Sequence, residues 1–344
     1  VSLLCFLVNC FHSCPYSPFY CPPLSSTKSA SVFFFFRYVR FFLGTSSLTS
    51  STTFFALGFR LGFGGGGPPY IGNTESYNGS SWTEGNDLNN VRRATAGMGT
   101  NTAALAAGGY GGSNSNNVET WNGSTWTETT EINTAREEAG GSGTQTGGLI
   151  FGGSPETGAT ESWNGSAWTE VNDLNTARNA VGGTGQTNTA AICATGQTPS
   201  PPTTTLTETW NGTSWTERND TNTARYYASS MSGSSTEALI AGGATPGSPT
   251  ANTEWFDGTS WTEISNLGTA RDQQGGLKVG GTATAALSFA GAEPSLSSKT
   301  EEFDAVTSGK VILLGEHSVV YGRHTIAVPV PLNIRVNVEE ADDG

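Results

Sequence analysis

The stretch Trp121-Asn122-Gly123-Ser124-Thr125-Trp126-Thr127-Glu128, followed by Arg136, decides the fold, because similar stretches stand at five places in the chain. Each copy has an aromatic residue, Asn-Gly or Asp-Gly, a Trp three residues after the Gly and an Arg ten residues after that Trp. These residues are Trp82, Trp126, Trp168, Trp215 and Trp261, with Arg92, Arg136, Arg178, Arg225 and Arg271. The steps between successive Trp residues are 44, 42, 47 and 46 residues. A repeat of this length, built from short apolar runs between turns, is typical of a β-propeller blade.

Each unit predicts four strands in a fixed order. After the Arg comes a Gly- and Ala-rich run, then a short apolar run that ends in a Gly pair such as Gly152-Gly153. A polar loop follows, then a strand that ends at the aromatic residue, then the Trp strand. Asn-Gly between two strands favours a type I′ turn, in which both residues have positive φ. We therefore expect an all-β fold, a β-propeller of about five four-stranded blades over residues 70–304.

The order of Arg, Gly pair, aromatic strand and Trp strand resembles the kelch repeat. The resemblance covers about two thirds of the chain and implies a ring whose variable loops bind a ligand. The Trp residues are then interpreted as core side chains between blades, with platforms for sugar rings as the alternative. The Arg residues are interpreted as structural partners of Glu or of the backbone, with a cluster at the axis as the alternative. The Glu of each Trp-Thr-Glu is expected to be solvated or to pair between blades.

The two ends of the repeat region suggest how the ring closes. The strand around Trp82 has no unit before it, and the unit that starts at Arg271 reaches Glu302-Phe303-Asp304 without a Trp strand. Closure removes exposed strand edges. We expect Trp82 to lie in the last blade, alongside Glu301–Phe303 or displacing it with the strand at Thr74–Tyr77. An open arc is the alternative.

Residues 1–69 differ from the rest, since they are rich in Phe and Ser and hold no Asp or Glu. We interpret this segment as low-complexity sequence, a targeting segment or an artefact, with a folded domain as the remaining alternative. Four of the five Cys lie within its first 21 residues, without the Cys-x-x-Cys pair of common zinc sites. The run Val32–Gly44 is too short to cross a bilayer and contains Arg37 and Arg40, so no stable membrane span is expected.

From Ser308 the chain reads Ser308-Gly309-Lys310-Val311-Ile312-Leu313-Leu314-Gly315-Glu316-His317-Ser318-Val319-Val320-Tyr321-Gly322. This run resembles the opening motif of mevalonate kinases, within the GHMP family of small-molecule kinases. Residues 305–344 are therefore interpreted as a truncated α/β kinase-like segment. The resemblance implies that Lys310 would lie by the phosphoryl-accepting hydroxyl, that Glu316 and His317 would line the substrate pocket, and that ATP and Mg²⁺ would be needed. No Gly-rich phosphate loop follows within the 34 residues after Lys310, so we expect no activity at this length.

Composition narrows the function of the repeats. The net charge is −13, and the chain from Glu75 on holds 12 basic and 29 acidic residues, which argues against nucleic acid. Residues 70–304 contain no His, which disfavours a copper oxidase. We expect a non-catalytic recognition scaffold without a cofactor. It would bind a protein or a carbohydrate through the loops after the Gly pairs, notably Thr195–Thr207 and Ala244–Thr253.

The expected location of the protein follows from the same resemblances. The variant with Trp-Asn-Gly-x-x-Trp-Thr-Glu and Asn-Thr-Ala-Arg is similar to repeats of secreted, cell-surface or phage-tail proteins. We therefore expect an extracellular or particle-surface location. The alternative function is a truncated or fused mevalonate kinase, inactive at this length and cytoplasmic.

Overall fold

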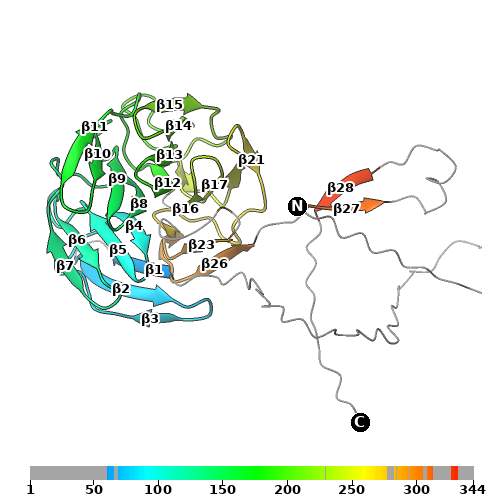
Figure 1. Ribbon diagram of the computed structural model, residues 1–344. Coiled ribbons are helices and arrows are strands. Elements are labelled where there is room, and N and C mark those ends of the chain that lie inside the picture. The colour runs from blue at the N-terminus through cyan, green and yellow to red at the C-terminus, as the bar shows by residue number, and fades with distance from the viewer. Residues whose placement is uncertain are drawn as a thin grey trace, which may run out of the picture. The chain divides into compact units, whose positions relative to one another are not determined.

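The computed structural model describes residues 60–65, 69–228, 230–276, 283, 285–293, 295–304, 308–312 and 327–331. The chain divides into two units, Val1–Thr52 and Thr53–Gly344, and the described residues all belong to the second. Their regular structure consists of strands and contains no helix. Antiparallel sheets stand side by side around an axis, so the all-β propeller predicted from the repeats is confirmed (Figure 1).

Five blades begin after the five Arg residues, and the first four have four strands each. They are β4 (Ala96–Thr100), β5 (Ala103–Ala107), β6 (Val118–Trp121) and β7 (Trp126–Thr129); β8 (Gly140–Thr144), β9 (Gly147–Phe151), β10 (Thr160–Trp163) and β11 (Trp168–Val171); β12 (Gly182–Thr187), β13 (Ala190–Ala194), β14 (Thr207–Trp210) and β15 (Trp215–Arg218); and β16 (Ser230–Gly233), β17 (Ala238–Ala241), β20 (Thr253–Phe256) and β21 (Trp261–Glu263). The fifth has three strands: β22 (Gly275–Gly276), β23 (Ala285–Phe289) and β26 (Thr300–Asp304). The first strands of successive blades contact one another around the axis.

The loops that follow the Gly pairs carry short hairpins in two blades. In the fourth blade β18 (Ala244–Thr245) pairs with β19 (Ser248–Pro249), and in the fifth β24 (Ala292–Glu293) pairs with β25 (Ser295–Leu296). These loops therefore have some backbone structure of their own.

A sixth sheet precedes the first Arg. It contains β1 (Arg60–Gly65), β2 (Ile71–Tyr77) and β3 (Trp82–Glu84), and the described residues add no innermost strand to it. Strand β1 lies within residues 1–69, for which the sequence predicted no strand. The signal was Gly64, whose φ of 68° matches the 65° of Gly108, the first Gly of a pair. A Cβ on either Gly would come within 2.5 Å of the carbonyl oxygen of the following Arg.

The predicted place of Trp82 in the last blade is wrong. Strand β3 pairs with β2, and among the described strands β26 pairs with β23 alone. Because β1 pairs along β2, the first three strands form a sheet of their own and do not compete with β26. The ring therefore holds the five blades and this additional sheet.

The additional sheet nevertheless joins the two ends of the repeat region. The indole N–H of Trp82 donates to Thr300 Oγ1 at 3.0 Å, and the Tyr77 hydroxyl donates to Glu302 at 2.8 Å. The rings of Trp82 and Phe289 lie 4.8 Å apart. Elsewhere the same Trp–Thr bond links a blade to the sheet before it, as between Trp126 and Thr74. The sheet β1–β3 therefore follows the fifth blade and precedes the first.

The core lies between neighbouring sheets. One cluster joins Leu105 of the first blade to Ile150 and Trp163 of the second, and corresponding clusters fill the other seams. The side chains of the first strands must be small, since a Cβ on Gly140 would come within 2.2 Å of the Phe151 ring. This crowding explains why Gly and Ala dominate these strands.

The hairpins between third and fourth strands differ from the type I′ turn that we expected. Trp121 pairs with Trp126, which leaves a loop of four residues. Gly123 has a φ of 95°, while Asn122 is not among the residues with positive φ. The Asn122 side chain instead accepts the backbone N–H groups of Ser124 and Thr125, each at 2.9 Å. The Asn therefore caps the turn from its side chain.

Two further strands are described near the C-terminus. β27 (Ser308–Ile312) pairs antiparallel with β28 (Ala327–Pro331), and Lys310 stands opposite Pro329. The predicted α/β kinase-like segment is not shown beyond this pair. Glu316 and His317 lie outside the described residues. Within the described part of the chain, no helix of the length and hydropathy needed to cross a membrane is found.

Candidate functional site

Each repeated Arg forms an ion pair inside its own blade. Its side chain is at most 1% exposed and contacts a Glu of the third strand. The pairs are Arg92–Glu119 at 2.7 Å, Arg136–Glu161, Arg178–Glu208 at 3.1 Å, Arg225–Glu254, and Arg271–Glu301 at 2.7 Å. The guanidinium groups are therefore enclosed within the blades and do not meet at the axis.

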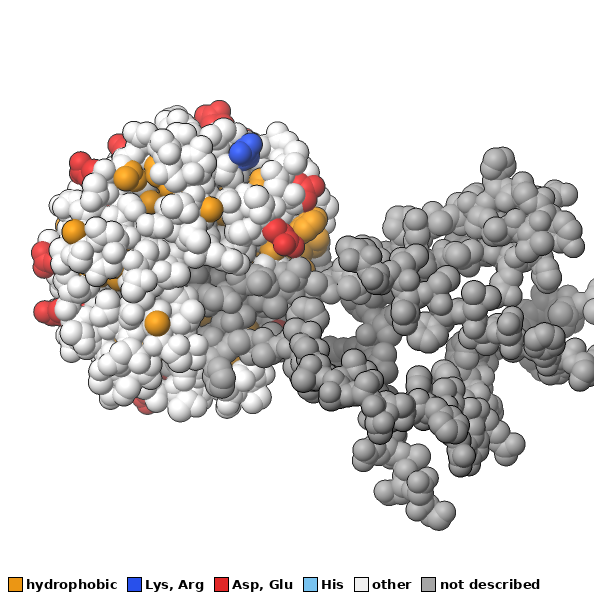
Figure 2. Space-filling view, viewed as in Figure 1, with side chains coloured by type: hydrophobic (Ala, Val, Ile, Leu, Met, Phe, Trp, Pro, Cys, Tyr) orange, Lys and Arg blue, Asp and Glu red, His pale blue; other side chains and the backbone are white. Residues whose placement is uncertain are grey.

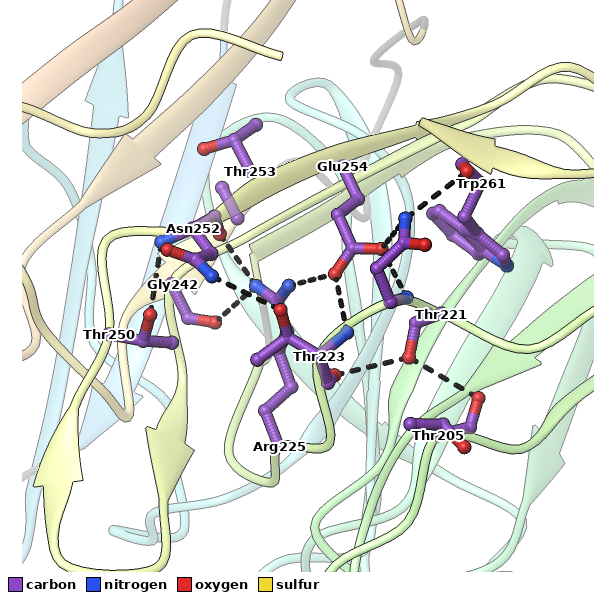
Figure 3. Close-up of polar contacts among 12 residues, drawn as sticks. Thr205, Thr221, Thr223, Arg225, Gly242, Thr250, Asn252, Thr253, Glu254 and Trp261 are labelled. Atoms are coloured by element: carbon purple, nitrogen blue, oxygen red, sulfur yellow. Dashed lines mark hydrogen bonds and ion pairs between the residues drawn. The ribbon is translucent and has the colours of Figure 1, made fainter. Parts of the chain in front are cut away.

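The pair of the fourth blade shows how both charges are satisfied (Figure 3). Arg225 donates to Glu254 and to the carbonyl oxygens of Gly242 at 3.0 Å and Asn252 at 2.6 Å. Glu254 also accepts the backbone N–H of Thr223 at 3.2 Å. Burial lowers the pKa of Arg225, and the charge of Glu254 opposes this shift. Such a network ties the segment before the blade to its third strand.

The backbone of the same Arg holds the preceding blade. The N–H of Gly196 donates to the Arg225 carbonyl oxygen at 2.9 Å, and the N–H of Gly243 donates to that of Arg271 at 2.9 Å. Each Arg therefore connects two blades. Sequence reasoning did not name the Glu partners, although a Glu at the second position of every third strand, as in Thr160-Glu161, was the available signal.

The Trp residues also lie in the seams. Trp126, Trp168, Trp215 and Trp261 are 5–6% exposed, and Trp82 is half-buried. Each ring packs against the aromatic residue before its turn, with centroids 5.0–5.5 Å apart. Glu84, Glu128, Glu170, Glu217 and Glu263, the Glu residues of the Trp-Thr-Glu motifs, are exposed. Four of the five Trp side chains are therefore buried, whereas these Glu side chains face solvent.

A different set of residues stands at the end of the axis. The two residues after each Arg vary between the copies: Arg93-Ala94, Glu137-Glu138, Asn179-Ala180, Tyr226-Tyr227 and Asp272-Gln273. The second residue of each pair has a φ between 49° and 57°, which is uncommon for a residue other than Gly. The first residue bridges to the residue that follows a Gly pair, as Arg93 does to Tyr110. These positions therefore adjoin the loops after the Gly pairs.

Charged and aromatic groups meet there across the ring. Tyr227 of the fourth blade and Glu138 of the second blade lie close enough for each to shift the pKa of the other, so their side chains approach one another across the intervening third blade. Arg93 Nη2 lies 3.5 Å from Glu137 Oε2. The Arg93 guanidinium also lies 5.1 Å from the centre of the Tyr110 ring. We call Arg93, Glu137, Glu138 and Tyr227 the axial cluster.

The carboxyl groups of this cluster are poorly solvated. Burial raises the pKa of Glu138, and the hydrogen bond from Tyr227 opposes that shift. Burial also raises the pKa of Glu137, whose enclosed Oε2 faces Arg93 Nη2 at 3.5 Å, and the charge of Arg93 opposes this shift. Burial raises the pKa of Tyr227 above its ordinary value, as do the charge and hydrogen bond of Glu138.

The described residues contain no group of three or more His, Cys, Asp and Glu side chains placed to hold a metal ion. In Figure 2 the acidic side chains of the described region lie apart along the rim, and the face shown has no broad basic area. Of the kinase-like candidates, Lys310 lies on β27, whereas Glu316 and His317 are not described.

Comparison with known proteins finds a short match to a kinase. No family model matches the chain. A mevalonate kinase from Archaeoglobus fulgidus is 50% identical over 38 residues, which are 11% of this chain and 13% of that kinase. The chain thus spans only a small part of this relative.

We predict that breaking one buried ion pair destabilises the propeller strongly. Arg225→Met leaves Glu254 buried without its counter-ion, which should lower the free energy of unfolding by about 3–5 kcal/mol. Glu217→Gln, on an exposed side chain, should change it by less than about 0.5 kcal/mol. Urea unfolding of both variants measures the difference. Equal small effects would contradict a structural role for the pair.

We predict a pH-dependent effect for Glu138→Gln. Because the pKa of Glu138 is raised in the folded chain, its contribution to stability is present at low pH and is lost as the pH rises through the folded pKa. A Gln cannot ionise, so the variant should melt at a higher temperature than the wild type at pH 8, and the gap should close towards pH 4. Glu156→Gln, at an exposed loop residue, is the control. A gap that does not change with pH would refute this assignment.

Proposed function

We propose that the propeller is a non-catalytic recognition scaffold of the kelch type, which binds a protein or a carbohydrate through one face. The face consists of the axial cluster and the loops after the Gly pairs. The observation that carries the proposal is the distribution of variation between the copies. The ion pairs, Trp seams and turns repeat, whereas the residues after each Arg and the adjoining loops differ.

The chemistry of this face suits a neutral polar ligand. Half-buried Tyr110, Tyr226 and Tyr227 offer ring faces and hydroxyls, and Glu137 and Glu138 offer acceptors. Amphipathic rings with a few placed polar groups are common where proteins bind sugars or polar peptide segments.

The extracellular or particle-surface location is also part of this proposal. Its support is the similarity of the repeats to those of surface proteins, together with the net charge of −13 that disfavours nucleic-acid partners.

The test is a binding screen with matched variants. The purified chain is applied to a printed glycan array and to a displayed peptide library. We expect ligands whose binding falls at least tenfold, roughly the worth of one lost buried hydrogen bond, in Glu137→Gln/Tyr227→Phe. Glu84→Gln/Glu170→Gln, on the outer strands, should bind as the wild type does. If every ligand found binds both double variants as tightly as it binds the wild type, the site is not at the axial cluster.

The 38-residue match supports a second proposal, that the C-terminal segment derives from the start of a mevalonate kinase. We expect no mevalonate-dependent consumption of ATP by this chain, because phosphoryl transfer needs a phosphate cradle and a carboxylate beyond the matched part. A coupled ATPase assay measures this, with Lys310→Ala as the control. Turnover that Lys310→Ala abolishes would make the segment a working site.

A further inference from the structure

Among the described strands, none covers the outer edge of the fifth blade as a fourth strand covers the other blades. In each four-stranded blade the third strand pairs with a Trp strand, and the aromatic residue stands opposite the Trp, as Phe256 does to Trp261. Strand β26 pairs with β23, and no described strand pairs with its other edge. The described part of this blade therefore ends at a third strand.

The side chains that a Trp would cover are more exposed in this blade. Phe303, the aromatic residue of β26, is half-buried, whereas Phe256 is fully buried. Leu267, in the segment that enters the fifth blade, is also half-buried. At the equivalent positions Ile132 and Leu174 are 1% and 5% exposed, and both pack in clusters that contain the Trp of their blade.

A Thr hydroxyl that can accept a hydrogen bond also lies beside the outer edge of the fifth blade. Trp126, Trp215 and Trp261 donate their indole N–H to Thr74, Thr160 and Thr207 of the preceding sheets, at 2.9–3.1 Å. The equivalent residue for the fifth blade is Thr253, which is 2% exposed.

The geometry of Thr253 matches that of a Thr whose Trp is present. Thr253 Oγ1 donates to the carbonyl oxygen two residues earlier at 3.3 Å, as Thr160 Oγ1 does at 3.2 Å. Each hydroxyl oxygen thereby keeps a place for one further hydrogen-bond donor. At Thr160 the indole of Trp215 fills that place, and at Thr253 no described indole does.

We propose that the edge of β26 binds a partner polypeptide that supplies an extended strand of the type Gly-x-x-Trp-Thr-Glu. The added strand lies antiparallel to β26, its Trp stands opposite Phe303 and covers Leu267, and its indole N–H donates to Thr253 Oγ1. Backbone hydrogen bonds along the edge hold the strand, and the Trp selects it. The four complete blades identify this occupant, because each carries such a strand at the same edge. This edge is separate from the face of the proposed function.

The test uses the full chain and a labelled peptide with the sequence of residues 257–264, Asp-Gly-Thr-Ser-Trp-Thr-Glu-Ile. Fluorescence anisotropy should show saturable binding. The same peptide with Ala in place of Trp should bind at least tenfold more weakly, roughly the worth of burying one large side chain. Absent binding, or equal binding of the two peptides, would overturn the proposal.

Matched variants of the chain locate the peptide. Thr253→Val should weaken binding several-fold by removing the acceptor, while Thr207→Val, at the same position of a complete blade, should leave binding unchanged. Melting curves confirm that both variants fold. Equal binding by the two variants would place the peptide elsewhere and overturn the proposal.

Two further measurements separate this proposal from its competitors. Glu137→Gln/Tyr227→Phe should bind the peptide as the wild type does, because the axial cluster takes no part, and a loss there would overturn the assignment to β26. Sedimentation of the free chain should show a monomer. A dimer that the Trp peptide dissociates would identify a second copy as the occupant and overturn the partner that we propose.

Discussion

The buried pair between Arg and Glu is the interaction on which the rest of the propeller depends. Two opposite charges taken out of water are costly unless they pair closely and gain further hydrogen bonds. In the fourth blade Glu254 also receives backbone N–H groups, and Arg225 reaches backbone carbonyl oxygens. Removing either partner leaves a buried charge, so neither can vary freely. The Arg carbonyl oxygen accepts from the Gly pair of the preceding blade, and the pair therefore sets both the shape of a blade and its distance from the next.

Because this framework repeats, the residues beside it are free to differ. The positions directly after each Arg hold Arg, Glu, Asn, Tyr or Asp, and each residue bridges to the residue after a Gly pair in its own blade. The ring curvature brings them towards the axis, where Glu138 and Tyr227 meet although a whole blade separates them in sequence. A constant frame with a variable end is a physical arrangement that suits recognition.

The sequence predicted much of this fold because each unit carries its own turn and strand signals. The order of strands and the seams filled by Trp126 and its equivalents followed from the repeat. The closure of the ring did not, since β1 was hidden in a Phe-rich segment and Trp82 resembled an orphan strand. The contact between Glu138 and Tyr227 could not be predicted either. It depends on the diameter of the ring, and no local pattern encodes that length.

The seam between β26 and the sheet β1–β3 has a consequence for how the chain acquires its structure. The bonds from Trp126, Trp215 and Trp261 join residues 52–55 positions apart, whereas the bond from Trp82 to Thr300 joins residues 218 positions apart. Contacts of low sequence separation form with a small entropic cost. The bond between Trp82 and Thr300 can form only when all the intervening blades are in place. During synthesis the blades can stack one after another as they emerge. The contact between the sheet β1–β3 and the fifth blade can form only after β26 has been synthesised. The seam is then the last contact made and the place where the native ring opens most readily.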